Sequence, residues 1–103
     1  MTPQAEPTAR DVLMKVRRLF TAGKWTRGMM HGKRNGEDVY CLVGAMRHVA
    51  RYSRYTNSGY VSAYETAMEA LKLHCNRDPI GFNDSQTSVE PVIELIDRAL
   101  TDV

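Results

Sequence analysis

Cysteine is scarce in this chain of 103 residues, which contains two, Cys41 and Cys75. Small secreted domains that depend on disulfides usually carry more, so we expect both residues to be free thiols in a reducing compartment. The chain has no C-x-x-C pair and no H-x₃-H pair, which are the spacings typical of structural zinc sites. We therefore predict no metal site and no cofactor.

Long apolar runs are also missing. No stretch approaches the roughly 18 residues that a membrane span needs, and the N-terminal segment lacks the basic start and apolar core of a signal peptide. The content of 43% hydrophobic and 25% charged residues is that of an ordinary globular domain. We expect a cytoplasmic protein without a membrane partner, in which residues 1–7 are a flexible tail and residues 8–103 form a single helical domain.

Apolar residues recur at steps of three and four in four segments, which is the spacing of amphipathic helices. The segments run from Thr8 to Gly23, from about Asp38 to Ala50, from Ser62 to about His74, and from about Thr87 to Leu100. Residues 79–87 are interpreted as a connector. The sequence therefore predicts an all-α fold, a compact domain of four helices around one core.

The segment 24–37 interrupts this pattern with three glycines and an Asn35-Gly36 turn signal. It is either an irregular loop or a short hairpin between the first two helices. Trp25 should pack over the core and direct its indole N–H to a carbonyl. Gly44 lies inside the second predicted helix, where glycine is unfavourable, so we expect another segment to approach it closely.

Cys41 is the candidate nucleophile. We place it in the first turn of a helix, where the unpaired N–H groups lower the pKa of a thiol. A catalytic thiol also needs a base, usually histidine, and an orienting amide or carboxylate, for which Asn83 and Asp84 are candidates. Alternatively Cys41 is a buried, inert thiol beside Gly44, and Asn83 and Asp84 are turn residues or a polar lock between loops.

Basic charge is concentrated in residues 1–55, which hold eleven lysines and arginines against four acidic residues. Residues 56–103 hold three against eight. The candidate binding residues form an arginine ridge of the second predicted helix with flanking tyrosines: Arg47, Arg51, Arg54, Tyr52 and Tyr55. Such a ridge can bind phosphates and stack on bases. Alternatively it is an ordinary solvated helix face. No known DNA-binding motif accompanies it.

Several of these residues follow each other in a characteristic order: Trp25-x-x-Gly28, then Cys41-Leu42-x-Gly44-Ala45, then Phe82-Asn83-Asp84. This order resembles a family of small uncharacterised proteins from actinobacteria and their phages, over about residues 10–101. Phe82 stands where the resemblance implies tryptophan. The resemblance implies a cytoplasmic actinobacterial or phage setting and specifies no activity.

These observations favour a small helical interaction protein, phage-encoded and binding a host protein. The first alternative is a cysteine-dependent hydrolase or transferase that uses Cys41 with a histidine and Asn83 or Asp84. The second is nucleic-acid binding through the arginine ridge. We predict a protein partner ahead of a nucleic acid, and a binding role ahead of an enzymatic one.

Overall fold

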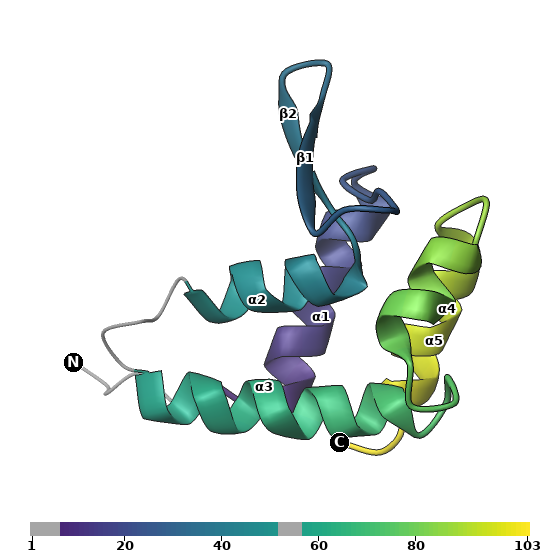
Figure 1. The fold of residues 1–103 in the computed structure, drawn as a ribbon. Helices are drawn as coiled ribbons and strands as arrows, with labels where there is room; N and C mark the ends of the chain where they lie inside the picture. Colours follow the sequence, from purple (N-terminus) through teal and green to yellow (C-terminus); the bar gives the residue numbers. More distant parts are fainter. Residues whose placement is uncertain (1–6, 52–56) are drawn as a thin grey trace.

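The computed structural model describes residues 7–51 and 57–103 (Figure 1), and the side chains of residues 51 and 57–61 also lie outside the description. The prediction of a flexible tail falls largely on residues 1–6, outside the described part of the chain. None of the described helices is both long and apolar enough to cross a membrane.

The described residues form five helices and one two-stranded antiparallel sheet. In chain order these are α1 (Ala9–Thr21), β1 (His31–Arg34), β2 (Glu37–Tyr40), α2 (Leu42–Arg51), α3 (Asn57–Lys72), α4 (Pro79–Ser85) and α5 (Glu90–Leu100). The prediction of an all-α domain of four helices is therefore wrong, and the fold is mixed α/β. Of the two alternatives for the segment after the first helix, the structure has the hairpin.

The hairpin forms because Asn35 and Gly36 both adopt left-handed backbone conformations, with φ of 54° and 82°. These angles produce a two-residue turn whose twist matches that of paired strands. Arg34 then pairs with Glu37, and the register continues to His31 opposite Tyr40. The second helix consequently begins at Leu42, and the prediction that it begins near Asp38 is wrong.

The connector predicted at residues 79–87 contains helix α4. Asp78 caps it by accepting a hydrogen bond from the Gly81 amide at 3.0 Å, and Pro79 occupies the first turn, where no amide donor is needed. Seven residues are too few for an apolar period to emerge. The predicted start of the third helix at Ser62 is also too late, because α3 begins at Asn57.

The predicted ends of the first helix are confirmed. The Thr8 hydroxyl accepts from the Asp11 amide at 3.1 Å, and the Asp11 carboxylate accepts from the Thr8 amide at 2.9 Å, which completes a capping box. After the helix, Gly23 has a φ of 83°, a conformation that favours glycine.

The core lies where α1 meets α2, α3 and α5. In Figure 1, α1 passes behind α2 and α3, and the hairpin extends away from the helices. The largest fully buried apolar side chains come from these four helices: Phe20, Leu13, Leu42, Met46, Leu71, Leu95, Ile96, Val12, Val16 and Val92. The predicted apolar stripes therefore do face one common core, to which the end of the hairpin adds the buried side chain of Tyr40.

Candidate functional site

Asn83 on α4 is fully buried and hydrogen-bonds to two other segments of the chain. Its Oδ1 accepts from the Trp25 indole at 2.7 Å and from the Leu42 amide at 3.1 Å. Its Nδ2 donates to the Thr26 carbonyl at 3.2 Å and to the Asp84 carboxylate at 3.1 Å. This amide ties the segment after α1 and the start of α2 to α4, as the alternative of a polar lock predicts. The carbonyl predicted for Trp25 is the side-chain amide of Asn83.

Asp84 extends the same network. Its Oδ1 accepts from the Gly28 amide at 2.9 Å, where Gly28 has a φ of 80°. The Arg27 guanidinium donates to the Gln86 carbonyl at 2.9 Å close by. Residues 25–28 are therefore fastened to α4 by both side-chain and backbone groups. We call this network, made by Trp25, Gly28, Leu42, Asn83 and Asp84, the polar lock.

Cys41 lies between β2 and α2 with 3% of its surface exposed. Its Sγ accepts from the Gly44 amide at 3.4 Å, and its own amide donates to the Met30 carbonyl at 3.3 Å. A Cβ built on Gly44 would overlap this same carbonyl of Met30, which is the close approach expected at Gly44. The sulfur is thus packed into the junction between hairpin and helix, an arrangement that favours the interpretation as an inert buried thiol.

The residues quoted for the family resemblance therefore lie close together, and their contacts are structural hydrogen bonds. The Trp25 indole N–H, the Asn83 amide and Oδ1 of Asp84 hydrogen-bond to one another and to backbone groups. An orienting amide or carboxylate acts by hydrogen bonding to the catalytic histidine, whereas the hydrogen bonds of Asn83 go to Trp25, Thr26, Leu42 and Asp84. The sequence indicated Asn83 and Asp84 as catalytic candidates. In the structure they join the segments on either side of the hairpin to α4.

Arg47 is the one member of the predicted arginine ridge whose side chain is described, and it is exposed on α2. Arg51 is the last residue of α2, with its side chain outside the description. Tyr52, Arg54 and Tyr55 also lie outside the described residues.

Arg47 borders a hollow of about 250 Å³ between the hairpin and α2. We call it the hairpin hollow, and its walls are Met30, His31, Tyr40, Gly44, Arg47 and His48. Three rings are stacked at it: His31 on Tyr40 with centroids 5.0 Å apart, and Tyr40 on His48 at 4.6 Å. The Tyr40 hydroxyl also lies 3.3 Å from His48 Nδ1. The sequence alone does not reveal this stack, because the stack depends on the strand register that places His31 opposite Tyr40.

A carboxylate stands beside the stack. Asp38 Oδ1 lies 2.7 Å from His31 Nε2 and 3.1 Å from Lys33 Nζ. The hydrogen bond with His31, followed by that with Lys33, lowers the pKa of Asp38 below its ordinary value. A lysine and a histidine therefore share one carboxylate on the hairpin surface.

A second hollow, of about 460 Å³, lies between α1 and α2. We call it the α1–α2 groove, and Lys15, Arg18, Leu19, Ala22, His48 and Val49 line it. Its lining combines apolar side chains with two cations of α1, and the described residues contribute no acid to it. Lys15 and Arg18 lie three residues apart on α1, so both stand on the same side of the helix.

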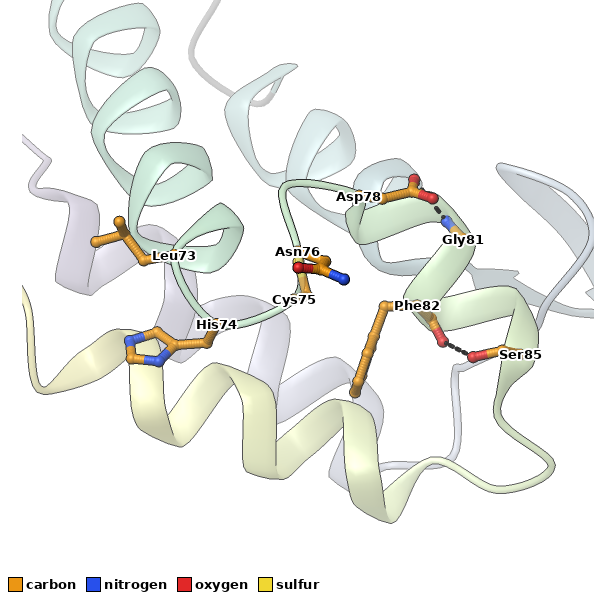
Figure 2. A pocket seen from close by; sticks show the side chains of 8 residues that line it. All are labelled: Leu73, His74, Cys75, Asn76, Asp78, Gly81, Phe82 and Ser85. Carbon is orange, nitrogen blue, oxygen red and sulfur yellow. Dashed lines mark hydrogen bonds between the residues drawn. The ribbon is translucent and has the colours of Figure 1, made fainter.

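A third hollow, of about 590 Å³, lies at the junction between α3 and α4 (Figure 2). His74, Cys75 and Ser85 line it, but each has a structural partner. His74 Nε2 lies 2.6 Å from Asp102 Oδ2, and the Ser85 hydroxyl donates to the Phe82 carbonyl at 2.8 Å.

Cys75 in the third hollow donates from Sγ to the Leu71 carbonyl at 3.2 Å. Burial raises the pKa of the Cys75 thiol, which disfavours the nucleophilic thiolate. The third hollow therefore holds a thiol and a histidine, but the raised pKa of Cys75 and its hydrogen bond to the Leu71 carbonyl disfavour the thiolate that nucleophilic catalysis needs.

The uneven distribution of charge along the sequence is also found on the surface of the folded protein. Lys15 and Arg18 line the α1–α2 groove and Arg47 lines the hairpin hollow, whereas most acids of the second half lie on α3 and α5. Among the ion pairs of the described residues, that between Arg17 and Asp97 at 2.7 Å joins the two halves. No group of three or more potential metal ligands occurs within the described residues.

Over residues 4–102 the chain matches a protein family described as "Family of unknown function (DUF6197)". No curated protein and no solved structure matches the chain. The match agrees with the expected resemblance to an uncharacterised family, and it assigns no activity to the polar lock or to the three hollows.

Proposed function

We propose that this chain, which belongs to the family of unknown function DUF6197, is a non-enzymatic binding module that takes an acidic amphipathic helix of a partner protein in its α1–α2 groove. The observation that carries the proposal is the lining of this groove. Leu19, Ala22 and Val49 offer apolar contact, while Lys15 and Arg18 bring positive charge. Helix-in-groove recognition uses an apolar stripe for affinity and flanking charges for orientation and specificity.

The placement of the candidate catalytic residues supports a binding role. Cys41 is buried beside Gly44, and Asn83 and Asp84 belong to the polar lock. Among the described residues, the groove offers apolar surface and cations without a carboxylate in its lining, which suits an acidic partner better than a basic one.

A pair of synthetic helices tests the proposal. The first is a peptide of about 14 residues with leucines at i, i+3, i+4 and i+7 and glutamates on its other faces, and the second replaces every glutamate with lysine. We expect the acidic peptide to bind at least about tenfold more tightly in fluorescence anisotropy, because its charges complement Lys15 and Arg18. Equal affinity for the two peptides, or no binding of either, would overturn the proposal.

Two charge reversals locate the binding site. Arg18 and Arg98 are the basic residues in the last turns of α1 and α5, so R18E and R98E change the same charge at equivalent positions of two helices. R18E should weaken binding of the acidic peptide by about tenfold or more, and R98E by less than about twofold. Equal losses for R18E and R98E would mean that net charge, and not the groove, attracts the peptide.

The identity of the natural partner is a further part of the proposal. We propose a cytoplasmic protein of the host cell, bound by a chain encoded by an actinobacterial phage, as the resemblance of the motifs implies. Cross-linking in an actinobacterial lysate, followed by reconstitution with the purified partner, tests this part. It is supported if wild-type protein and R98E bind the purified partner and R18E does not.

Nucleic-acid binding is the second candidate function, and the hairpin is the observation that favours it. Lys33 and Arg34 are exposed on a hairpin that extends from the helices, and Arg47 is exposed on α2 near its base (Figure 1). Binding to phosphates weakens steeply with salt. A labelled single-stranded oligonucleotide should therefore bind at low salt and be released as salt rises. No binding even at low salt would exclude this function.

A further inference from the structure

We propose that the hairpin hollow is a binding site for the phosphoryl group of a phosphomonoester. The site is separate from the helix-binding role of the α1–α2 groove, although His48 lines both. It draws its walls from the segment before β1, from both strands and from α2, so it exists because the hairpin folds back onto the helix.

The charge of the walls favours an anion. Arg47 is permanently charged, and its planar guanidinium can donate two parallel hydrogen bonds to phosphate oxygens. His31 and His48 add ring nitrogens, and an anion in contact with them favours their protonated forms. Within the described part of the chain, the lining of the hollow includes no carboxylate. The nearby Asp38 already accepts from Lys33 and lies 2.7 Å from His31 Nε2, so its carboxylate is engaged on the hairpin.

The stacked rings make the walls rigid before any ligand arrives. Tyr40 is 6% exposed and lies between the rings of His31 and His48, with interplanar angles of 12° and 24°. Its hydroxyl is also within hydrogen-bonding distance of His48 Nδ1. A preorganised site loses little conformational entropy on binding, so a small group can be held by few contacts.

The volume sets the size of the ligand group. A hollow of about 250 Å³ is below the usual range of about 300 to 1,000 Å³ for pockets that enclose a drug-sized molecule. It has room for a phosphoryl group and the first atoms of its ester, while the remainder of the ligand stays outside. Such a group is carried by phosphorylated side chains and by nucleotides, and the structure favours the shared chemistry of the two.

Three small probes test the site and its source. Phenyl phosphate, O-phosphoserine and adenosine 5′-monophosphate are titrated into the full chain and followed by two-dimensional amide NMR and calorimetry, with benzenesulfonate as a singly charged comparison. We expect phenyl phosphate to bind at least about tenfold more tightly than benzenesulfonate, because a doubly charged group meets Arg47 and two imidazoles. The largest shifts should fall on residues 30–31, 40 and 47–48.

The order of the other two probes identifies the source of the phosphate. Tighter binding of phosphoserine indicates a phosphorylated protein, and tighter binding of the nucleotide indicates a nucleotide or nucleic-acid end. Either order supports the phosphomonoester site, provided that the shifts fall on the hairpin hollow. Failure of all three phosphates to bind, or an affinity no higher than that of benzenesulfonate, overturns it.

Two neutralised arginines provide the matched control. Arg47 lines the hollow and Arg34 lies next to the turn of the hairpin, and both are exposed, so R47Q and R34Q remove the same charge without disturbing the core. R47Q should weaken phenyl phosphate binding by about tenfold or more, and R34Q by less than about twofold. Equal losses would show that general surface charge holds the phosphate and would overturn the proposal. The helical peptides contain no phosphate, so this assay and the groove assay can fail independently.

Discussion

At Asn83 a single buried amide hydrogen-bonds to Trp25 and Thr26 after α1, to Leu42 at the start of α2 and to its neighbour Asp84. Replacement by alanine leaves the Trp25 indole N–H and the Leu42 amide without their acceptor and removes buried side-chain volume. Each unsatisfied buried donor costs about 1 to 3 kcal/mol.

We therefore expect N83A to lower the free energy of unfolding by about 3 kcal/mol or more, measured by urea denaturation. D84N is the comparison, because its side-chain oxygen can still accept from the Gly28 and Asn83 donors. Its loss should stay below about 1 kcal/mol. A loss as small for N83A as for D84N would show that the polar lock contributes little to stability.

Gly44 is the second residue whose identity the packing dictates. Alanine is the better helix former by about 1 kcal/mol, so G44A should stabilise α2 if space were open. The added Cβ would instead overlap the Met30 carbonyl, which is backbone and cannot move without shifting the hairpin. We expect G44A to lower the free energy of unfolding by about 2 to 4 kcal/mol.

Gly32 supplies the control for G44A. A Cβ at Gly32 would meet the end of the Met29 side chain, which is 54% exposed and can rotate away. G32A should therefore change stability by less than about 1 kcal/mol in the same urea experiment. If G44A were neutral or stabilising, α2 and the Met30 backbone would have to lie further apart than the structure shows.

These two residues also show what a sequence reveals at this scale. The unfavourable glycine inside a helical pattern correctly indicated a close approach, and Asn-Asp after an aromatic correctly indicated a polar lock as one alternative. The partners could not be read, because Met30 and Gly44 are joined through a hairpin register, and Trp25 and Asn83 lie far apart in the chain. Local chemistry marks a special position, and the tertiary fold decides what it contacts.

At the scale of elements, the hairpin carries the carboxyl group of Asp38, whose pKa reports on its contacts with Lys33 and His31. Lys33 is paired with Asp38 across the strands, and His31 reaches the same carboxylate. Both hydrogen bonds favour the charged form, so the pKa of Asp38 lies below its ordinary value of 3.8. These two contacts stabilise the hairpin fully at a pH above the ordinary pKa of aspartate. The stabilisation is lost as the pH falls through the lowered pKa that Asp38 has in the folded protein.

A carbon-detected NMR titration of the Asp38 carboxyl group, from about pH 2 to pH 6, measures this directly. We expect a midpoint below that of aspartate in an unstructured peptide. H31Q should raise the pKa of Asp38 more than K33Q does, because the hydrogen bond with His31 is the largest cause of the shift. An unshifted midpoint in the wild-type protein would mean that His31 and Lys33 do not hold the Asp38 carboxylate in solution.

The elements that sequence periodicity missed share a physical reason. The strands have four residues each and α4 has seven, so neither offers enough turns or alternations for an apolar pattern to rise above chance. Asn35-Gly36 signalled the turn, but Glu37 and Asp38 also suit a helix N-terminus, and the two interpretations compete. The long amphipathic helices α1 and α5 were predicted because burial of one face leaves a repeating signature.

For the whole molecule, the two thiols report on whether the core opens as one unit. Cys41 is 3% exposed at the junction of hairpin and α2, and Cys75 is 7% exposed after α3. Burial also raises the pKa of Cys75, so its thiolate fraction at neutral pH is small. A disulfide reagent reacts with thiolate, and it has to wait for the structure to open.

We predict that C75A, which leaves Cys41, and C41A, which leaves Cys75, are both labelled at least about a hundredfold more slowly than a free thiol under native conditions. With added urea, the two labelling rates should rise with the same dependence on urea if hairpin, α2 and α3 open together. A weaker urea dependence for Cys41 would mean that the hairpin opens locally while the helices remain folded. Rapid native labelling of Cys41 would contradict its burial, and with it the main structural argument against a catalytic thiol.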